Sequence, residues 1–116
     1  MEKKKIFVLD SVFGRDIFQE IMDVAEDMKI PVDIEGYEIK RKIPIPLGKD
    51  IYFLHLTDID LKDVEKLRKV QPRSYFVATT RAGISYEDSK LFNESLTIFD
   101  YDDFEGILKR ALENNK

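Results

Sequence analysis

Four short apolar runs, each followed by polar residues, constrain the fold of this 116-residue chain more than any other feature. They cover residues 6–9, 51–56, 75–78 and 96–99. Near-continuous apolar runs of this kind are typical of strands buried on both faces, as in a parallel sheet covered by helices. In such sheets ligands bind beyond the carboxyl ends of the strands, which is where the polar residues fall. The runs therefore predict both a fold class and the edge of the sheet at which a site would lie.

Amphipathic helical patterns separate these runs. Apolar positions recur at helical spacing over residues 15–29, 60–70 and 104–112, and a capping-box sequence at Ser85 predicts a shorter helix. A further short strand is expected at residues 32–34. Strands that alternate with helices in this way predict a three-layer α/β sandwich with right-handed crossovers.

The whole chain, residues 1–116, is expected to form one such domain, since no linker, repeat or low-complexity tract divides it. The sheet should be mostly parallel, with about five strands and the first strand at its centre, as in a flavodoxin-like topology.

The stretch from Tyr37 to Asp50 departs from the alternation. A helix would normally connect two parallel strands here, but the sequence alternates apolar and polar residues and contains Pro44 and Pro46. Proline confines it to an edge strand or an extended loop. Its cations could contact a phosphate backbone. We favour the alternative, in which they keep an edge strand from pairing with other chains. They are Lys40, Arg41, Lys42 and Lys49.

The composition excludes several classes of protein. A net charge of −4 argues against general affinity for nucleic acid, and the absence of cysteine excludes disulfides and thiolate metal sites. No apolar stretch approaches the roughly 18 residues of a membrane helix. The apolar run after the basic N-terminus is too short for a secretory signal. We therefore expect a cytoplasmic protein without a membrane partner.

Asp10 and Asp58 are the acids best placed for chemistry. Asp10 ends the first apolar run and Asp58 follows the second. Clustered carboxylates at one sheet edge are the ligands that Mg²⁺ or Mn²⁺ prefers. Asp10 is equally well explained as a cap of the turn that follows it, whereas Asp58 has no competing structural role.

Other acids are explained by the helices that they precede. Asp60 stands at the N-cap of the helix that begins at Leu61, and Asp63 falls in its first turn, where the helix dipole favours an acid. The same reasoning accounts for Asp100 before the last helix. His55, the only histidine, lies in an apolar strand and is expected to be a satisfied core residue.

Thr79, Thr80 and Arg81 follow the third apolar run. Two hydroxyls and a guanidinium at the site edge could bind a phosphate. Ordinary surface polarity at a strand end is the commoner explanation. No glycine-rich phosphate loop is present.

Three segments resemble PIN-like nuclease domains, most closely the RNase family found at the C-terminus of the Mut-seven proteins. Residues 8–15 are similar to the aspartate and apolar-Gly-basic turn after that family's first strand, and residues 58–64 to its acidic helix start. Residues 75–81 are similar to the strand before its Thr-Arg-Asp motif, although Ala82 replaces the aspartate. The resemblance implies a PIN-like fold and a Mg²⁺- or Mn²⁺-dependent ribonuclease acting on RNA, or an inactivated relative of one.

The resemblance also implies roles for particular residues. The catalytic acids would be Asp10 and Asp58. The metal ligands would be Asp10, Asp58, Asp60 and Asp63. The phosphate-binding residues would be Arg15, Thr80 and Arg81.

A second resemblance is to the receiver domains of response regulators. Residues 56–61 are similar to the strand end that carries the phosphoacceptor aspartate, with Asp58 in that role. Asp10 resembles a metal-binding acid, and Thr79 or Thr80 the switch hydroxyl. The chain lacks the Lys-Pro that follows the family's fifth strand. This alternative implies a non-catalytic regulatory or protein-interaction module, with a protein partner or a homodimer. An anion or small-ligand binder at the same edge is a third alternative.

Overall fold

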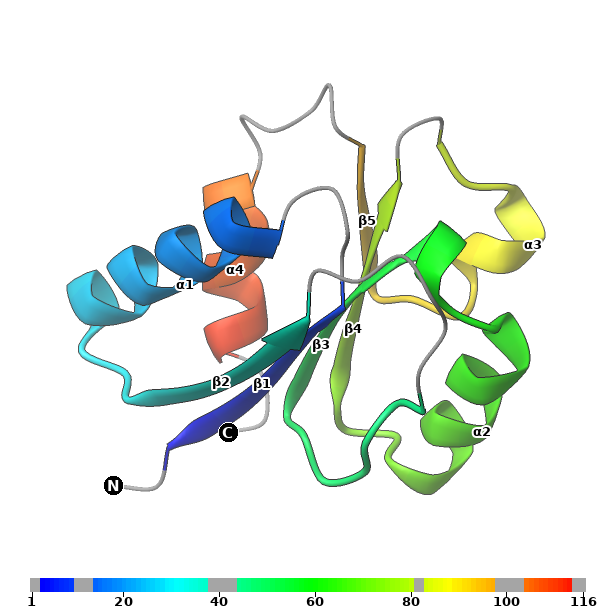
Figure 1. Cartoon of the computed structure of the whole chain (residues 1–116), viewed down its shortest axis with the longest axis horizontal. Helices are drawn as coiled ribbons and strands as arrows, with labels where there is room; N and C mark the ends of the chain where they lie inside the picture. The colour runs from blue at the N-terminus through cyan, green and yellow to red at the C-terminus, as the bar shows by residue number, and fades with distance from the viewer. Residues whose placement is uncertain (1–2, 10–13, 38–43, 81–82, 98–103, 114–116) are drawn as a thin grey trace.

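The computed structural model describes residues 3–9, 14–37, 44–80, 83–97 and 104–113 (Figure 1). Strands and helices alternate along the chain, as the sequence predicts. The strands are β1 (Lys4–Leu9), β2 (Val32–Tyr37), β3 (Ile51–His55), β4 (Tyr75–Thr80) and β5 (Glu94–Thr97). The helices are α1 (Gly14–Met28), α2 (Leu61–Val70), the single turn α3 (Tyr86–Ser89) and α4 (Phe104–Glu113), and a 3-10 turn (Leu56–Asp58) follows β3.

All five strands pair in parallel, in the order β2-β1-β3-β4-β5. This confirms the predicted parallel sheet and its flavodoxin-like topology. The expectation that the first strand is central was wrong, because β3 occupies the middle and β1 lies beside it. All five residues of β3 are buried, as a strand covered on both faces requires.

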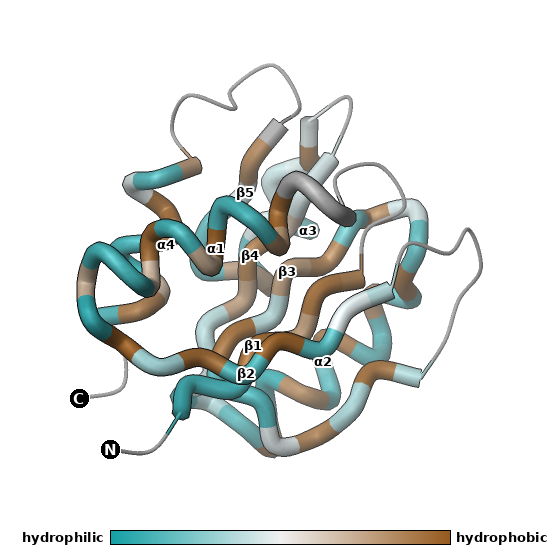
Figure 2. Tube along the Cα trace, turned by 60° about the vertical axis from the view of Figure 1, so that its left-hand side comes forward, coloured by the Kyte–Doolittle hydropathy of each residue, from teal (hydrophilic) through white to brown (hydrophobic). Residues whose placement is uncertain are grey.

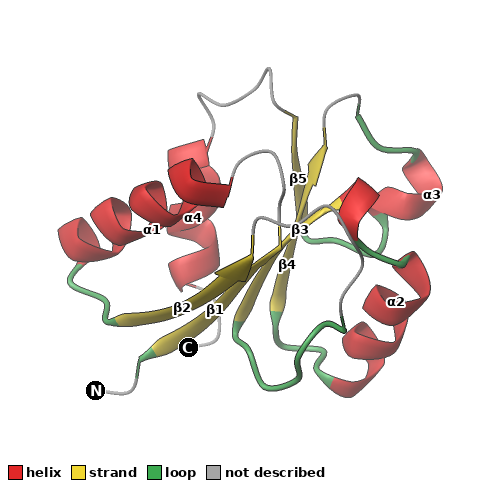
Figure 3. Cartoon of the chain, viewed as in Figure 1, coloured by secondary structure: helices red, strands yellow, loops and turns green. Residues whose placement is uncertain are grey.

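Helices cover both faces of the sheet. Helices α1 and α4 lie on one face, and α2 and α3 lie on the other (Figures 1 and 3). Successive residues of β1 point to opposite faces, so Ile6 and Val8 join one core cluster while Phe7 and Leu9 join the other. Along the tube of Figure 2 the strands are largely apolar, whereas the helices alternate between polar and apolar residues.

The helix starts follow the capping rules that the sequence suggested. The carboxylate of Asp60 accepts a hydrogen bond from the Lys62 N–H at 3.0 Å and caps α2. The hydroxyl of Ser85 accepts one from the Asp88 N–H at 3.2 Å and caps α3. The structural explanation for Asp60 is therefore confirmed. Asp100 lies outside the described residues.

Residues 44–50, which we call the strap, form the described part of the connection from β2 to β3. They contain no strand or helix, so the extended loop is the correct alternative here. The Tyr52 hydroxyl donates a hydrogen bond to the Pro46 carbonyl at 2.7 Å and accepts one from the Gln71 amide at 3.1 Å. Ser74 donates a further hydrogen bond to the Lys49 carbonyl at 2.7 Å. The strap is thus held against the sheet and the end of α2 by side-chain hydrogen bonds.

An ion-paired group ties β4, β5 and α4 together. Arg110 donates hydrogen bonds to both carboxylate oxygens of Glu94, and the Tyr75 hydroxyl donates one to the same carboxylate. Burial acts to raise the pKa of Glu94, but the hydrogen bonds from Arg110 and Tyr75 outweigh it and leave the pKa below its ordinary value. Burial, followed by the hydrogen bond to Glu94, raises the pKa of Tyr75 to about 12.

These shifts predict how stability depends on pH. The contribution of Glu94 is present above its ordinary pKa of 4.5 and is lost as the pH falls through the lower folded value. The contribution of Tyr75 is present below its ordinary pKa of 10.0 and is lost as the pH rises toward about 12. Urea titrations at several pH values would measure the free energy of unfolding. In Tyr75→Phe, its decline at alkaline pH should be flatter than in the wild type, and its decline at acid pH should begin at a higher pH. Parallel profiles for the two proteins would contradict this account.

Candidate functional site

The candidate site lies where β3 and β4 end side by side. His55 is the last residue of β3 and pairs in register with Thr79 of β4. The 3-10 turn that follows β3 contacts β4, so it stays at this edge instead of leaving the sheet. Asp58 is the last residue of that turn. Side chains from β3, the turn and β4 are therefore gathered at the carboxyl edge that the sequence analysis singled out.

His55 stands at the end of the central strand of the sheet. Its side chain is 1% exposed, and its Nδ1 atom shares a hydrogen bond of 2.7 Å with the Thr57 hydroxyl. The Asp58 carboxylate lies 3.8 Å from the same Nδ1 atom. Within the described residues, the buried Nε2 atom has no hydrogen-bond partner. The prediction of a core histidine is confirmed for its burial, but only one of the two ring nitrogens is satisfied.

Asp58 lies deeper in the protein than the sequence suggested. Only 4% of it is exposed, and it follows the last residue of β3 by three positions. A carboxylate buried to this degree requires nearby polar or charged groups. His55 supplies one of them. Asp58 therefore supports the conformation of the turn, whatever further role it has.

The two threonines are part of β4 and are buried, so surface polarity does not describe them. Thr79 is 0% and Thr80 is 6% exposed. The Thr80 hydroxyl donates a hydrogen bond to the Gly83 carbonyl at 3.0 Å. Gly83 has a φ of 96°, a conformation that favours glycine.

The remaining predicted site residues do not all reach this edge in the described structure. Asp60 is committed to capping α2, and Asp63 faces the strap from the first turn of α2. Asp10 and Arg81 lie outside the described residues, as does the side chain of Arg15. Across the described ranges, no three acidic or histidine side chains are placed to hold a metal ion. Three of the four acids expected to bind a metal ion are described, namely Asp58, Asp60 and Asp63. The structure does not bring these three together into a metal site.

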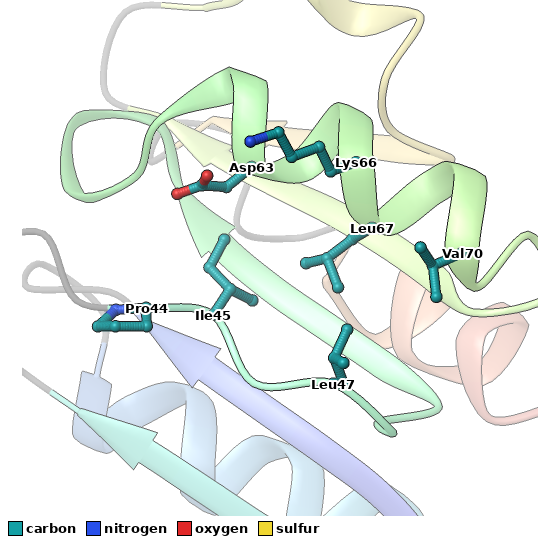
Figure 4. Close-up of a pocket in the computed structure, with 7 residues that line it drawn as sticks. All are labelled: Pro44, Ile45, Leu47, Asp63, Lys66, Leu67 and Val70. Carbon is teal, nitrogen blue, oxygen red and sulfur yellow. The ribbon is translucent and has the colours of Figure 1, made fainter.

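A groove was missed by the sequence analysis. Pro44, Ile45 and Leu47 of the strap face α2 across a groove of about 230 Å³ (Figure 4). The prolines of this stretch predicted an extended segment, but the spacing of apolar residues does not predict where such a segment packs.

Comparison with known proteins identifies the fold. No protein-family model matches the chain, and no curated protein matches it. Among solved structures, the BeF3-activated receiver domain of DrrB has a TM-score of 0.64 at 14% identity, covering 97% of this chain and 99% of that one. The receiver domain of the Francisella response regulator 1452 has a TM-score of 0.62 at 15% identity, covering 96% and 98%. A CheY-like receiver domain from Methanospirillum hungatei JF-1 has a TM-score of 0.57 at 16% identity, covering 95% and 94%.

These likenesses overturn the nuclease interpretation. The PIN-like resemblance was wrong: receiver structures match over nearly the whole chain, and the sheet has the order β2-β1-β3-β4-β5. The misleading signal was an acid after an apolar strand, which any α/β domain with ligands or caps at that edge can show. The expectation of an RNA partner rested on that resemblance and loses its support.

In the part of the chain that is described, no helix is long and apolar enough to cross a membrane. The observed architecture is an α/β domain with a five-stranded parallel sheet in the order 2-1-3-4-5. The chain has the CheY-like fold of receiver domains.

Proposed function

We propose that this domain is a receiver-like regulatory module that acts through contact with a protein partner, without accepting a phosphoryl group on Asp58. The fold likeness to receiver domains supports the regulatory part of the proposal. The proposal that Asp58 is not phosphorylated rests on the residues at the end of β3. The strand ends on the buried His55, and the first acid after it, Asp58, is only 4% exposed.

The chemistry of phosphoryl transfer explains why this observation matters. The attacking oxygen must lie in line with the leaving oxygen, and a cation must neutralise the charge that develops. A carboxylate that is almost fully covered gives a phosphodonor little access. His55 cannot form an acyl phosphate, and its Nδ1 atom is already engaged with Thr57.

A second candidate function is phosphoacceptance by Asp58, as the receiver resemblance implied. One observation favours it: the matched DrrB structure is of a receiver domain activated by BeF3. In this alternative Thr79 or Thr80 would respond to the phosphoryl group. Asp10 would assist in holding the ion.

Incubation with acetyl phosphate and Mg²⁺, followed by intact-mass measurement, separates the two candidates. We expect no mass increase, because Asp58 is covered. A receiver domain with an exposed phosphoacceptor, treated in the same tube, serves as the positive control. A gain of one phosphoryl group that disappears in Asp58→Asn would establish the second candidate and contradict the first.

A further inference from the structure

We propose that the groove between the strap and α2 binds an amphipathic helix of a partner protein, with an apolar stripe flanked by acidic residues. This inference rests on the proposed function, because it names the surface through which the module would act. The groove lies on the α2 and α3 face of the sheet, where the strap runs alongside α2.

The walls of the groove are apolar and face one another. Ile45 and Leu47 project from the strap toward Leu67 and Val70 of α2 (Figure 4). Leu47 is 66% exposed and Val70 is 67% exposed, so both remain largely uncovered. Large apolar side chains from two elements that share an open hollow are typical of an interaction site.

The groove has the direction and length of a short helix. Its α2 wall is formed by positions 63, 66, 67 and 70, which lie on one side of a helix at i, i+3, i+4 and i+7 spacing. These residues span about 10 Å along the axis at 1.5 Å per residue. A partner helix lying alongside α2 would present its own i, i+3/i+4, i+7 stripe to this wall.

Charge complementarity selects an acidic helix. Lys66 lines the groove and Lys62 precedes it by one turn. In the described ranges, neither ammonium has a carboxylate within ion-pair distance. Asp63 is the acid that lines the groove, so a partner would have to avoid a carboxylate at that end.

The probe for this proposal is a capped helical peptide with leucine along one stripe and glutamate on both flanks. Its affinity for the whole domain is measured by fluorescence anisotropy, and methyl NMR follows Ile45, Leu47 and Val70. We expect saturable binding with shifts at these methyl groups. The matched peptide with lysine in place of glutamate should bind at least about tenfold more weakly. Absence of binding, or equal binding of the two peptides, would overturn the proposal.

Variants of exposed residues locate the binding surface without disturbing the core. Leu47→Gln and Val70→Gln should each weaken binding by about tenfold or more, because they remove apolar contacts without changing the charge. Lys66→Glu should weaken binding of the glutamate peptide and strengthen binding of the lysine peptide. Met22→Gln is the matched control, because Met22 is 52% exposed on α1, which covers the opposite face. Binding that is unchanged in the groove variants, or reduced equally by Met22→Gln, would place the peptide elsewhere and contradict the proposal.

The peptide-binding experiment and the acetyl phosphate experiment test different proposals, so one proposal can be overturned without the other. Phosphorylation of Asp58 together with groove-dependent peptide binding would overturn the proposed function and leave the groove assignment standing. An unchanged mass without peptide binding would overturn the groove assignment alone.

Discussion

Replacing Tyr52 with alanine should lower the free energy of unfolding by about 3–5 kcal/mol, because it removes a large aromatic ring from the core. Tyr52 is 0% exposed, and its ring stacks on Phe76 with the centroids 4.9 Å apart and the planes 6° apart. Phe7 flanks the same ring at 6.1 Å. Truncation would leave a cavity under the strap, beside Phe76 and Phe7.

Tyr52→Phe keeps the ring and removes only the hydroxyl, so it measures what the hydroxyl contributes to stability. It removes the hydrogen bond to the Pro46 carbonyl and the acceptor of the Gln71 amide, at a cost of about 1–3 kcal/mol. Because the strap forms one wall of the groove, peptide binding should weaken as well. Urea denaturation of both variants tests the stability change.

Tyr37→Phe is the control for the loss of a tyrosine hydroxyl. Tyr37 is 40% exposed, and its hydroxyl donates a hydrogen bond to Glu35 at the surface. Its removal should change stability by less than about 0.5 kcal/mol. Equal costs at Tyr37 and Tyr52 would contradict the role given to the hydroxyl of Tyr52 in holding the strap.

Gly36→Ala should destabilise the protein by about 1–3 kcal/mol, although alanine is ordinarily the better residue within a strand. A Cβ atom at Gly36 would lie 1.9 Å from the Cζ atom of Phe18, which packs across β2 from α1. The Phe18 ring would have to move away from Gly36, which would disturb the packing of α1 against β2.

A double-mutant cycle checks the cause of this effect. In a Phe18→Ala background the clash is absent, so Gly36→Ala should become neutral or stabilising by about 0.5–1 kcal/mol, the ordinary advantage of alanine over glycine. The readout is again the urea midpoint. The same destabilisation in both backgrounds would show that the ring is not responsible.

The sequence was sufficient to predict most of the fold. Continuous apolar runs predicted buried parallel strands, and the N-cap residues Asp60 and Ser85 predicted the starts of α2 and α3. The order of the strands was harder, because β1 and β3 have the same apolar pattern and only the pairing decides which one lies in the middle.

The residues after β3 and β4 meet at one edge of the sheet, as the sequence predicted, and the assignment of a functional site to this edge stays a prediction. Their burial was not predicted. His55 terminates β3, and Asp58 turns inward in the following 3-10 turn. A sequence shows that an acid follows a strand, but not whether the next turn leads its carboxylate into solvent or into the core. The strap was equally unpredictable, since its position depends on long-range hydrogen bonds to Tyr52 and Gln71.

We propose that this CheY-like domain acts without a phosphoryl switch. A titration of the ¹⁵N-labelled domain with beryllofluoride and Mg²⁺ tests this proposal, because beryllofluoride mimics a phosphoryl group on a carboxylate and needs no donor. We predict that the amide resonances of Asp58, Thr79 and Thr80 do not shift. Saturable shifts at these residues that vanish in Asp58→Asn would contradict the proposal.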